Sequence, residues 1–169
     1  MPILIITAAY LVVLVVAFVL WILHEISYTM AKYRVLRRQK WDLNICCGLT
    51  DGGGTNADIM RHAELPHYVQ VDDVYDLPFK DGEFDTVLCS HTIEHVDDPE
   101  AMYRELKRVG GSVTIVIPPL WDIAAVLNVF EHRSIFLTFR KEHVDRLPRF
   151  VPLPGARWLQ QRAGQRIRA

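Results

Sequence analysis

Small, acidic and hydroxyl-bearing residues follow four short apolar runs in the middle of the chain. In chain order these residues are Gly48, Asp58, Asp73, Ser90 and His91. Ligands of α/β proteins bind at the carboxyl ends of parallel strands, so residues that follow four such strands would share one site. A carboxylate after the second run suits the two hydroxyls of a ribose, and one after the third can accept a hydrogen bond from an adenine amine. The joint spacing therefore predicts a ligand that contains adenosine.

The runs that must position these residues are typical of buried strands. We expect strands at residues 42–47, 55–59, 68–71, 84–89 and 112–117. They are apolar on both faces and alternate with segments of helical pattern, which favours a parallel sheet. The expected fold class is a compact, Rossmann-like α/β domain.

Two helices are expected after the fourth strand. The first covers residues 98–109 and opens with an aspartate N-cap followed by proline. The second is expected over residues 120–130. Further along, residues 133–140 could supply an edge strand, and the proline-rich segment 147–155 should be irregular and extended.

Five stretches carry motifs that occur together in one protein family. They lie at residues 43–48, 56–59, 73–79, 81–87 and 90–99, and include Leu-Pro-Phe, Phe-Asp-x-Val and Glu-His-x-x-Asp-Pro. Over residues 42–119 the chain resembles the class I S-adenosylmethionine-dependent methyltransferases, particularly a small type-11-like branch with an LNxGCG motif followed by NxDI. This resemblance implies a methyltransferase core of Rossmann-like fold, with S-adenosylmethionine as the cofactor.

The resemblance also implies roles for the residues that would bind the cofactor. Gly48 would belong to a glycine-rich turn beside the methionine moiety, with Asn44 and Cys46 in the same motif. Asp58 would bind the ribose and Asp73 would meet the adenine.

The residues after the fourth strand are expected to face the reaction. Ser90 and His91 would lie beside the sulfonium and face the methyl acceptor. His91 is the candidate catalytic base, because the unperturbed pKa of histidine lies near neutrality; capping the strand end is the alternative role. Glu94 and His95 are expected to be structural and to fix the turn before the helix.

The first motif departs from the family's pattern. Cys46 and Thr50 stand where the family has glycines, and Asn44 stands where an acidic residue is common. Nine residues separate Gly48 from Asp58, too few for the helix that usually connects parallel strands. These departures leave two functions open: an active methyltransferase, or a methyltransferase-like subunit that has lost its activity. An adenine-nucleotide sensor is less favoured, because the chain has no phosphate-binding G-x-x-x-x-G-K-[ST] run.

The N-terminal segment predicts where the domain acts. Residues 2–23 carry no charge, and at about 1.5 Å per helical residue they would extend about 33 Å, enough to cross a hydrocarbon core of about 30 Å. A cleaved signal peptide is the alternative, but the run is long and lacks a basic n-region and an Ala-x-Ala site. We therefore expect a single-pass membrane helix that continues as a stalk.

Charge around this helix predicts its orientation. Five Lys and Arg residues between positions 32 and 40 follow the apolar run, and only the α-amino group precedes it. The positive-inside rule then places the N-terminus outside and the domain in the cytoplasm. The expected acceptor is lipid-like or membrane-associated; the inactive alternative would instead serve a membrane protein complex.

The chain divides into three expected parts. They are the anchor and stalk at 1–39, the methyltransferase-like domain at 40–132 and a basic C-terminal extension at 133–169. The extension suits a lipid surface better than a nucleic acid, because no RNA- or DNA-binding module is recognisable. The three cysteines show no C-x-x-C spacing, which indicates free thiols and no metal site.

Overall fold

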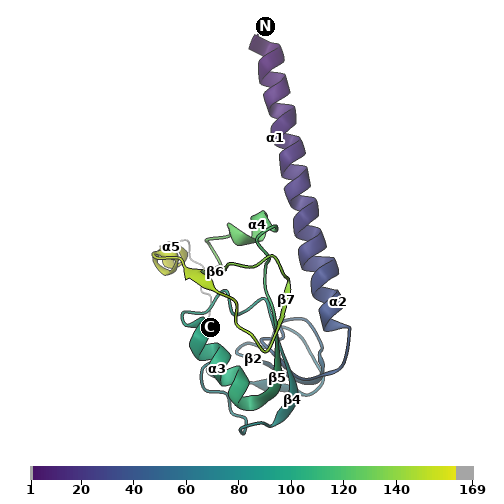
Figure 1. Ribbon diagram of the computed structural model, residues 1–169, viewed down its shortest axis with the longest axis vertical. Helices are drawn as coiled ribbons and strands as arrows, with labels where there is room; N and C mark the ends of the chain where they lie inside the picture. Colours follow the sequence, from purple (N-terminus) through teal and green to yellow (C-terminus); the bar gives the residue numbers. More distant parts are fainter. Residues whose placement is uncertain (1, 163–169) are drawn as a thin grey trace.

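A six-stranded sheet forms the centre of the computed structural model, which describes residues 2–162. Its strands are β1 (Trp41–Ile45), β2 (Gly53–Asp58), β3 (Tyr68–Gln70), β4 (Phe84–Ser90), β5 (Gly110–Val116) and β7 (Glu142–Val144). They are ordered β3-β2-β1-β4-β5-β7; the first five are parallel, and β7 runs antiparallel to β5. The expected Rossmann-like α/β fold is confirmed (Figure 1).

Helix α3 (Pro99–Val109) covers one face of this sheet. The Asp98 carboxylate accepts a hydrogen bond from the Ala101 N–H at 2.9 Å, and proline occupies the first helical position, as the sequence predicted. The buried side chains of its apolar stripe are Met102, Leu106 and Val109. Strand β5 begins at the residue after α3, so the helix delivers the chain directly into the sheet.

The opposite face is covered by the end of the N-terminal helix. This helix is continuous through α1 (Pro2–Glu25), a π-helical segment η1 (Ile26–Ala31) and α2 (Lys32–Leu36). Val35 and Leu36 are buried against the cluster of Trp41, Leu88 and Val116. The Trp41 indole N–H also donates to the Leu36 carbonyl at 3.0 Å. The stalk, residues 24–36, thereby covers part of the face that a crossover helix would occupy.

Residues 46–52 connect β1 to β2 without a helix, as the spacing predicted. Asn44 Nδ2 donates to the Thr50 carbonyl at 2.8 Å, and the buried Asn56 side-chain oxygen accepts from the Gly52 N–H at 2.9 Å. A Cβ added at Gly52 would lie 2.6 Å from the Asn44 Cβ, so glycine allows the loop to pack this closely. Two buried amide side chains therefore hold the short connection against the sheet.

The predicted helix over residues 120–130 is largely wrong. Only α4 (Ile123–Val126) is helical, and its N-cap Asp122 accepts from the Ala125 N–H at 3.2 Å. The chain continues in turns after Val126, and the amides of Arg133 and Ser134 then donate to the Glu94 carbonyl at 2.8 and 3.1 Å. A long-range contact thus overrides the local helical pattern.

The C-terminal segment also differs from expectation. Strand β6 (Ser134–Phe136) pairs with β8 (Phe150–Pro152) in a separate two-stranded sheet, and β7 takes the edge position of the main sheet. The Phe136 and Phe150 rings lie 5.4 Å apart across the pair. Packing between apolar side chains determines which strands pair, and the local sequence does not specify that pairing. Helix α5 (Ala156–Arg162) follows; residues 163–169 of the expected basic extension lie outside the described residues.

The stalk runs antiparallel to the parallel strands. At one end, His24 Nδ1 lies 3.1 Å from the carboxylate of Asp122, which follows β5. At the other end, Leu36 meets Trp41 at the start of β1. Helix α1 therefore projects past the carboxyl edge of the sheet (Figure 1). Within residues 2–162, one helix, Ile3–Leu36, is long enough to cross a membrane and contains an 18-residue stretch with a mean hydropathy of 3.1.

One buried carboxylate holds the Leu-Pro-Phe loop to α3. Glu105 Oε1 accepts from the Leu77 N–H at 2.7 Å and from Arg108 Nη2 at 2.6 Å. Arg108 also donates to the carbonyls of Leu77 and Phe79. The hydrogen bonds from Arg108, stronger than the opposing effect of burial, lower the pKa of Glu105 below its ordinary value of 4.5.

We predict that Glu105→Gln lowers the free energy of unfolding by about 1–3 kcal/mol, because charge-assisted hydrogen bonds to the loop are lost. A carboxylate with a lowered folded-state pKa contributes stability that is present above about pH 4.5 and is lost as the pH falls. The variant should therefore lose less stability on acidification than the wild type. Thermal unfolding of the detergent-solubilised chain across the acidic range measures this, with exposed Glu64→Gln as the control. Parallel pH profiles for wild type and Glu105→Gln would contradict it.

Candidate cofactor site at the carboxyl edge of the sheet

Two predicted site residues are in direct contact at the ends of β1 and β2. The Gly48 N–H donates to Asp58 Oδ2 at 2.8 Å. Gly48 has a φ of 55°, a left-handed conformation that glycine adopts without strain, and a Cβ added there would meet nothing within 4 Å. Asp58 ends β2 and is 8% exposed. The glycine turn is therefore fixed by the acidic residue and has open space above it.

Backbone strain marks the same edge. Cys46 directly follows β1 and has a φ of 52°, and His91 directly follows β4 and has a φ of 55°. Non-glycine residues rarely adopt this conformation, and such strain is concentrated at functional sites. Because β1 and β4 are neighbours in the sheet, the two strained residues lie on adjacent strand ends.

The Cys46 side chain occupies a place that the family leaves to glycine. Burial, with smaller contributions from nearby acidic groups, raises the pKa of the Cys46 thiol well above its ordinary value. Cys47 and Cys89 are also free, and burial raises the pKa of Cys89 to about 12. The cysteines at this edge are therefore neutral thiols, which fill space and are poor nucleophiles.

The remaining predicted cofactor residues differ in their surroundings. Asp73 is exposed in the turn after β3, where its carboxylate accepts from the Tyr75 N–H at 2.8 Å. Ser90 ends β4, and its buried Oγ has no hydrogen-bond partner among residues 2–162. Asn44 is buried and donates to Thr50, so its described contacts support the loop.

His91 is held by contacts on every side. Its Nε2 lies 2.7 Å from Lys141 Nζ, its Nδ1 lies 3.2 Å from Glu94 Oε1, and its ring meets the edge of Tyr28 at a centroid distance of 5.2 Å. Burial lowers the pKa of His91, although Glu94 acts in the opposite direction. Burial also lowers the pKa of Lys141 to about 8. A protonated Lys141 donates to Nε2 and occupies the lone pair that a catalytic base would use.

A cavity of about 380 Å³ opens beside His91. His24 and Tyr28 of the stalk line one side of it, and Ala125 of α4 and His132 line another. Lys141, His132 and the stalk residues could not be predicted from the sequence, because they come from segments distant in the chain and carry no motif. Local signals of a polar network here were His91, Glu94 and His95, which directly follow an apolar strand.

The central part of the chain is similar to known methyltransferases. Residues 53–115 match a family model described as a methyltransferase domain. A stretch of 48 residues is 50% identical to ajmaline N-methyltransferase from Rauvolfia serpentina and covers 28% of this chain and 16% of that protein. A stretch of 41 residues is 54% identical to norajmaline N-methyltransferase from the same plant and covers 24% of this chain and 14% of that protein. The chain thus spans less than a fifth of the length of either relative.

Solved structures resemble the chain over longer stretches at lower identity. One is a SAM-dependent methyltransferase from Thermotoga maritima that is described as a possible histamine N-methyltransferase. It is 22% identical with a TM-score of 0.43, and the match covers 59% of this chain and 55% of that protein. A protein from Pyrococcus horikoshii is 18% identical with a TM-score of 0.44, and the match covers 81% of this chain and 79% of that protein.

The matched domain implies S-adenosylmethionine as the cofactor. The residues at the carboxyl edge fit it: open space lies over Gly48, the Asp58 carboxylate stands at the end of β2, and the buried Ser90 Oγ lacks a partner among the described residues. The match begins at Gly53, so the LNxGCG motif and the small branch that it indicated stay predictions.

We predict that Asp58→Asn weakens S-adenosylmethionine binding about ten- to hundredfold, because a charge-assisted hydrogen bond contributes about 1.5–3 kcal/mol. Asparagine keeps the size of the side chain and can still accept from the Gly48 N–H. Calorimetry on the detergent-solubilised chain measures the affinity, and exposed Asp85→Asn at the opposite end of the sheet is the control. Equal affinities for wild type and Asp58→Asn would remove Asp58 from the site.

Proposed function

We propose that this chain is a membrane-anchored, S-adenosylmethionine-dependent methyltransferase that acts on a lipid-like or membrane-associated acceptor. The observation that carries the proposal is the direction of the stalk. The apolar helix projects from the carboxyl edge of the sheet, so the predicted cofactor site faces the bilayer in which that helix would be inserted (Figure 1).

The stalk is fixed to the domain along its length. His24 lies 3.1 Å from Asp122, and Lys141 Nζ donates to the buried Ser27 hydroxyl at 3.0 Å. Further along, Arg38 Nη1 donates to Glu142 at 3.0 Å. These contacts join the helix to the segments around β5 and β7, so the anchor would orient the domain in addition to tethering it.

The cavity beside His91 lies at the level where the helix would leave the hydrocarbon. His24, the first residue after the uncharged run, is one of its lining residues. Beside it, Ile123 of α4 is 43% exposed, and the nearby Leu127 and Phe130 are 63% and 48% exposed. Exposed apolar side chains at this end of the domain suit contact with acyl chains. An acceptor with an apolar tail would therefore reach the cavity from the membrane.

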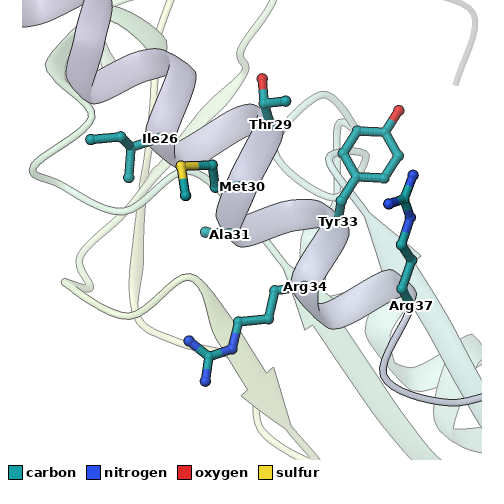
Figure 2. A pocket seen from close by; sticks show the side chains of 7 residues that line it. All are labelled: Ile26, Thr29, Met30, Ala31, Tyr33, Arg34 and Arg37. Carbon is teal, nitrogen blue, oxygen red and sulfur yellow. The ribbon is translucent and has the colours of Figure 1, made fainter.

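The other side of the stalk carries a groove that is basic at the end remote from the apolar run. The groove has a volume of about 740 Å³, and its lining includes Met30, Tyr33, Arg34 and Arg37 (Figure 2). Arg34 and Arg37 follow His24 by ten and thirteen residues, which is about 15–20 Å along the helix. These arginines therefore stand on the domain side of the lipid surface, where the positive-inside rule expects basic residues.

The proposed chemistry requires positioning and a dry site. When bound, S-adenosylmethionine would supply an electrophilic methyl group on its sulfonium for direct transfer to a lone pair of the acceptor. Asp58 would hold the ribose and Ser90 would contact the cofactor, while His91, fixed by Lys141 and Glu94, forms the wall on the acceptor side. Stalk and α4 line the cavity and would limit its access to water, which would suit in-line displacement.

The function is tested with the full-length chain in liposomes of natural lipid extract and S-adenosylmethionine labelled in its methyl group. We expect label in the lipid phase or in a membrane protein, and at least tenfold less with Asp58→Asn. Label confined to water-soluble compounds would contradict a membrane acceptor. Binding of S-adenosylmethionine without transfer would contradict the choice of acceptor, and no binding at all would favour an inactive subunit.

The orientation is part of the proposal. Lys32, Arg34 and Arg37 follow the apolar run, so we expect the domain on the cytoplasmic side. In right-side-out vesicles the domain should resist added protease, and in inside-out vesicles it should be digested. The reverse pattern would place the domain outside.

A further inference from the structure

Glu94 is a buried carboxylate surrounded by imidazole rings. It is 1% exposed, and neither carboxylate oxygen has a hydrogen-bond partner within the described residues 2–162. His91 Nδ1 lies 3.2 Å from Oε1 but outside hydrogen-bond geometry. A buried charge normally has hydrogen bonds, an opposite charge or a metal ion beside it. Here His91, His95 and His132 surround the carboxylate, and the positive charge can come from protonated rings or from a metal ion.

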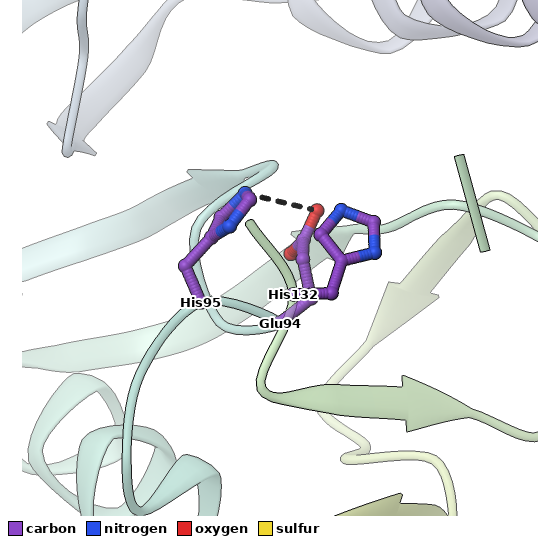
Figure 3. Close-up of side chains that lie close together, drawn as sticks. All are labelled: Glu94, His95 and His132. Atoms are coloured by element: carbon purple, nitrogen blue, oxygen red, sulfur yellow. Dashed lines mark ion pairs between the residues drawn. The ribbon is translucent and has the colours of Figure 1, made fainter. Parts of the chain in front are cut away.

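Two further metal-ligating side chains surround this carboxylate. Ligand atoms of Glu94, His95 and His132 all lie within 4.8 Å of one another (Figure 3). His95 Nε2 is 3.9 Å from Glu94 Oε1, and the two histidine rings have centroids 4.9 Å apart. Glu94 and His95 follow β4, whereas His132 follows α4, so two separate segments contribute.

The tautomer of His95 is set by a backbone contact. His95 Nδ1 lies 2.9 Å from the Glu131 carbonyl oxygen, which can only accept, so Nδ1 carries the proton. In the neutral ring, Nε2 then presents a lone pair on the side of Glu94. Two acceptors facing each other repel unless a cation lies between them. A backbone carbonyl on the second ring nitrogen is also the usual support of a metal-binding histidine.

We propose that Glu94, His95 and His132 bind a divalent transition-metal ion of the zinc type. Two imidazoles and one carboxylate are a common zinc ligand set, with the fourth position left to water or substrate. Here His95 and His132 line the cavity beside the stalk, so that position would open into it. Ligand atoms of a tetrahedral zinc site are about 3.3 Å apart, so the three side chains would draw together on binding. The site stands independently of methyl transfer.

The test uses the full-length, tag-free chain in detergent, stripped of metal with a chelator. Co²⁺ is the spectroscopic probe, and Zn²⁺ is titrated by calorimetry. We expect one equivalent of Co²⁺ with visible absorption typical of four-coordinate nitrogen and oxygen ligands, displaced by Zn²⁺. Glu94→Gln and His132→Asn should each weaken Zn²⁺ binding at least a hundredfold, while the exposed His62→Asn leaves it unchanged.

Circular dichroism separates loss of the site from loss of the fold, and the single variant His95→Asn provides a second, less buried probe. Failure of the wild-type chain to bind stoichiometric Zn²⁺ would overturn the proposal, with protonated histidines then compensating Glu94. Undiminished binding by folded Glu94→Gln and His132→Asn would also overturn it. Neither result depends on methyltransferase activity.

Discussion

The packing of the stalk across the sheet is the contact on which the rest of the arrangement depends. Val35 and Leu36 bury their side chains against Leu88 and Val116, at about 1.5–3 kcal/mol for each large apolar side chain removed from water. The same helix carries the uncharged segment at its other end. Burial of one end therefore fixes where the other end points, and core packing aligns the sheet edge that would hold the cofactor with the apolar helix.

This alignment compensates for a shortened core. Parallel strands normally need a crossover of a dozen or more residues, usually a helix that also covers the sheet. Residues 46–52 return the chain to the start of β2 in an extended loop and cover little of the sheet. The stalk contributes the missing apolar surface from outside the usual domain. We therefore expect the domain and its N-terminal helix to fold as one unit.

The sequence predicted those parts of the molecule that local pattern determines. Apolar runs located the five parallel strands, and Asp98 with Pro99 located the start of α3. The contact of Gly48 with Asp58 could be predicted from the motif spacing, because the two residues lie at the ends of neighbouring parallel strands. The contact of Lys141 with His91 could not be predicted, because it depends on the pairing of β7 with β5. The short α4 and the β6–β8 pair were missed for the same reason: long-range partners decide them.

The departure at Asn44 has a structural cause in the short connection. The loop directs the Thr50 carbonyl at this side chain, which donates to it at 2.8 Å and also donates to Asn56 at 3.3 Å. A carboxylate cannot donate, so the acidic residue common at this position would leave that carbonyl unpaired and add an uncompensated buried charge. Asparagine is thus what a helix-free β1–β2 connection requires. The change at this position follows from the architecture and is not by itself evidence that catalysis was lost.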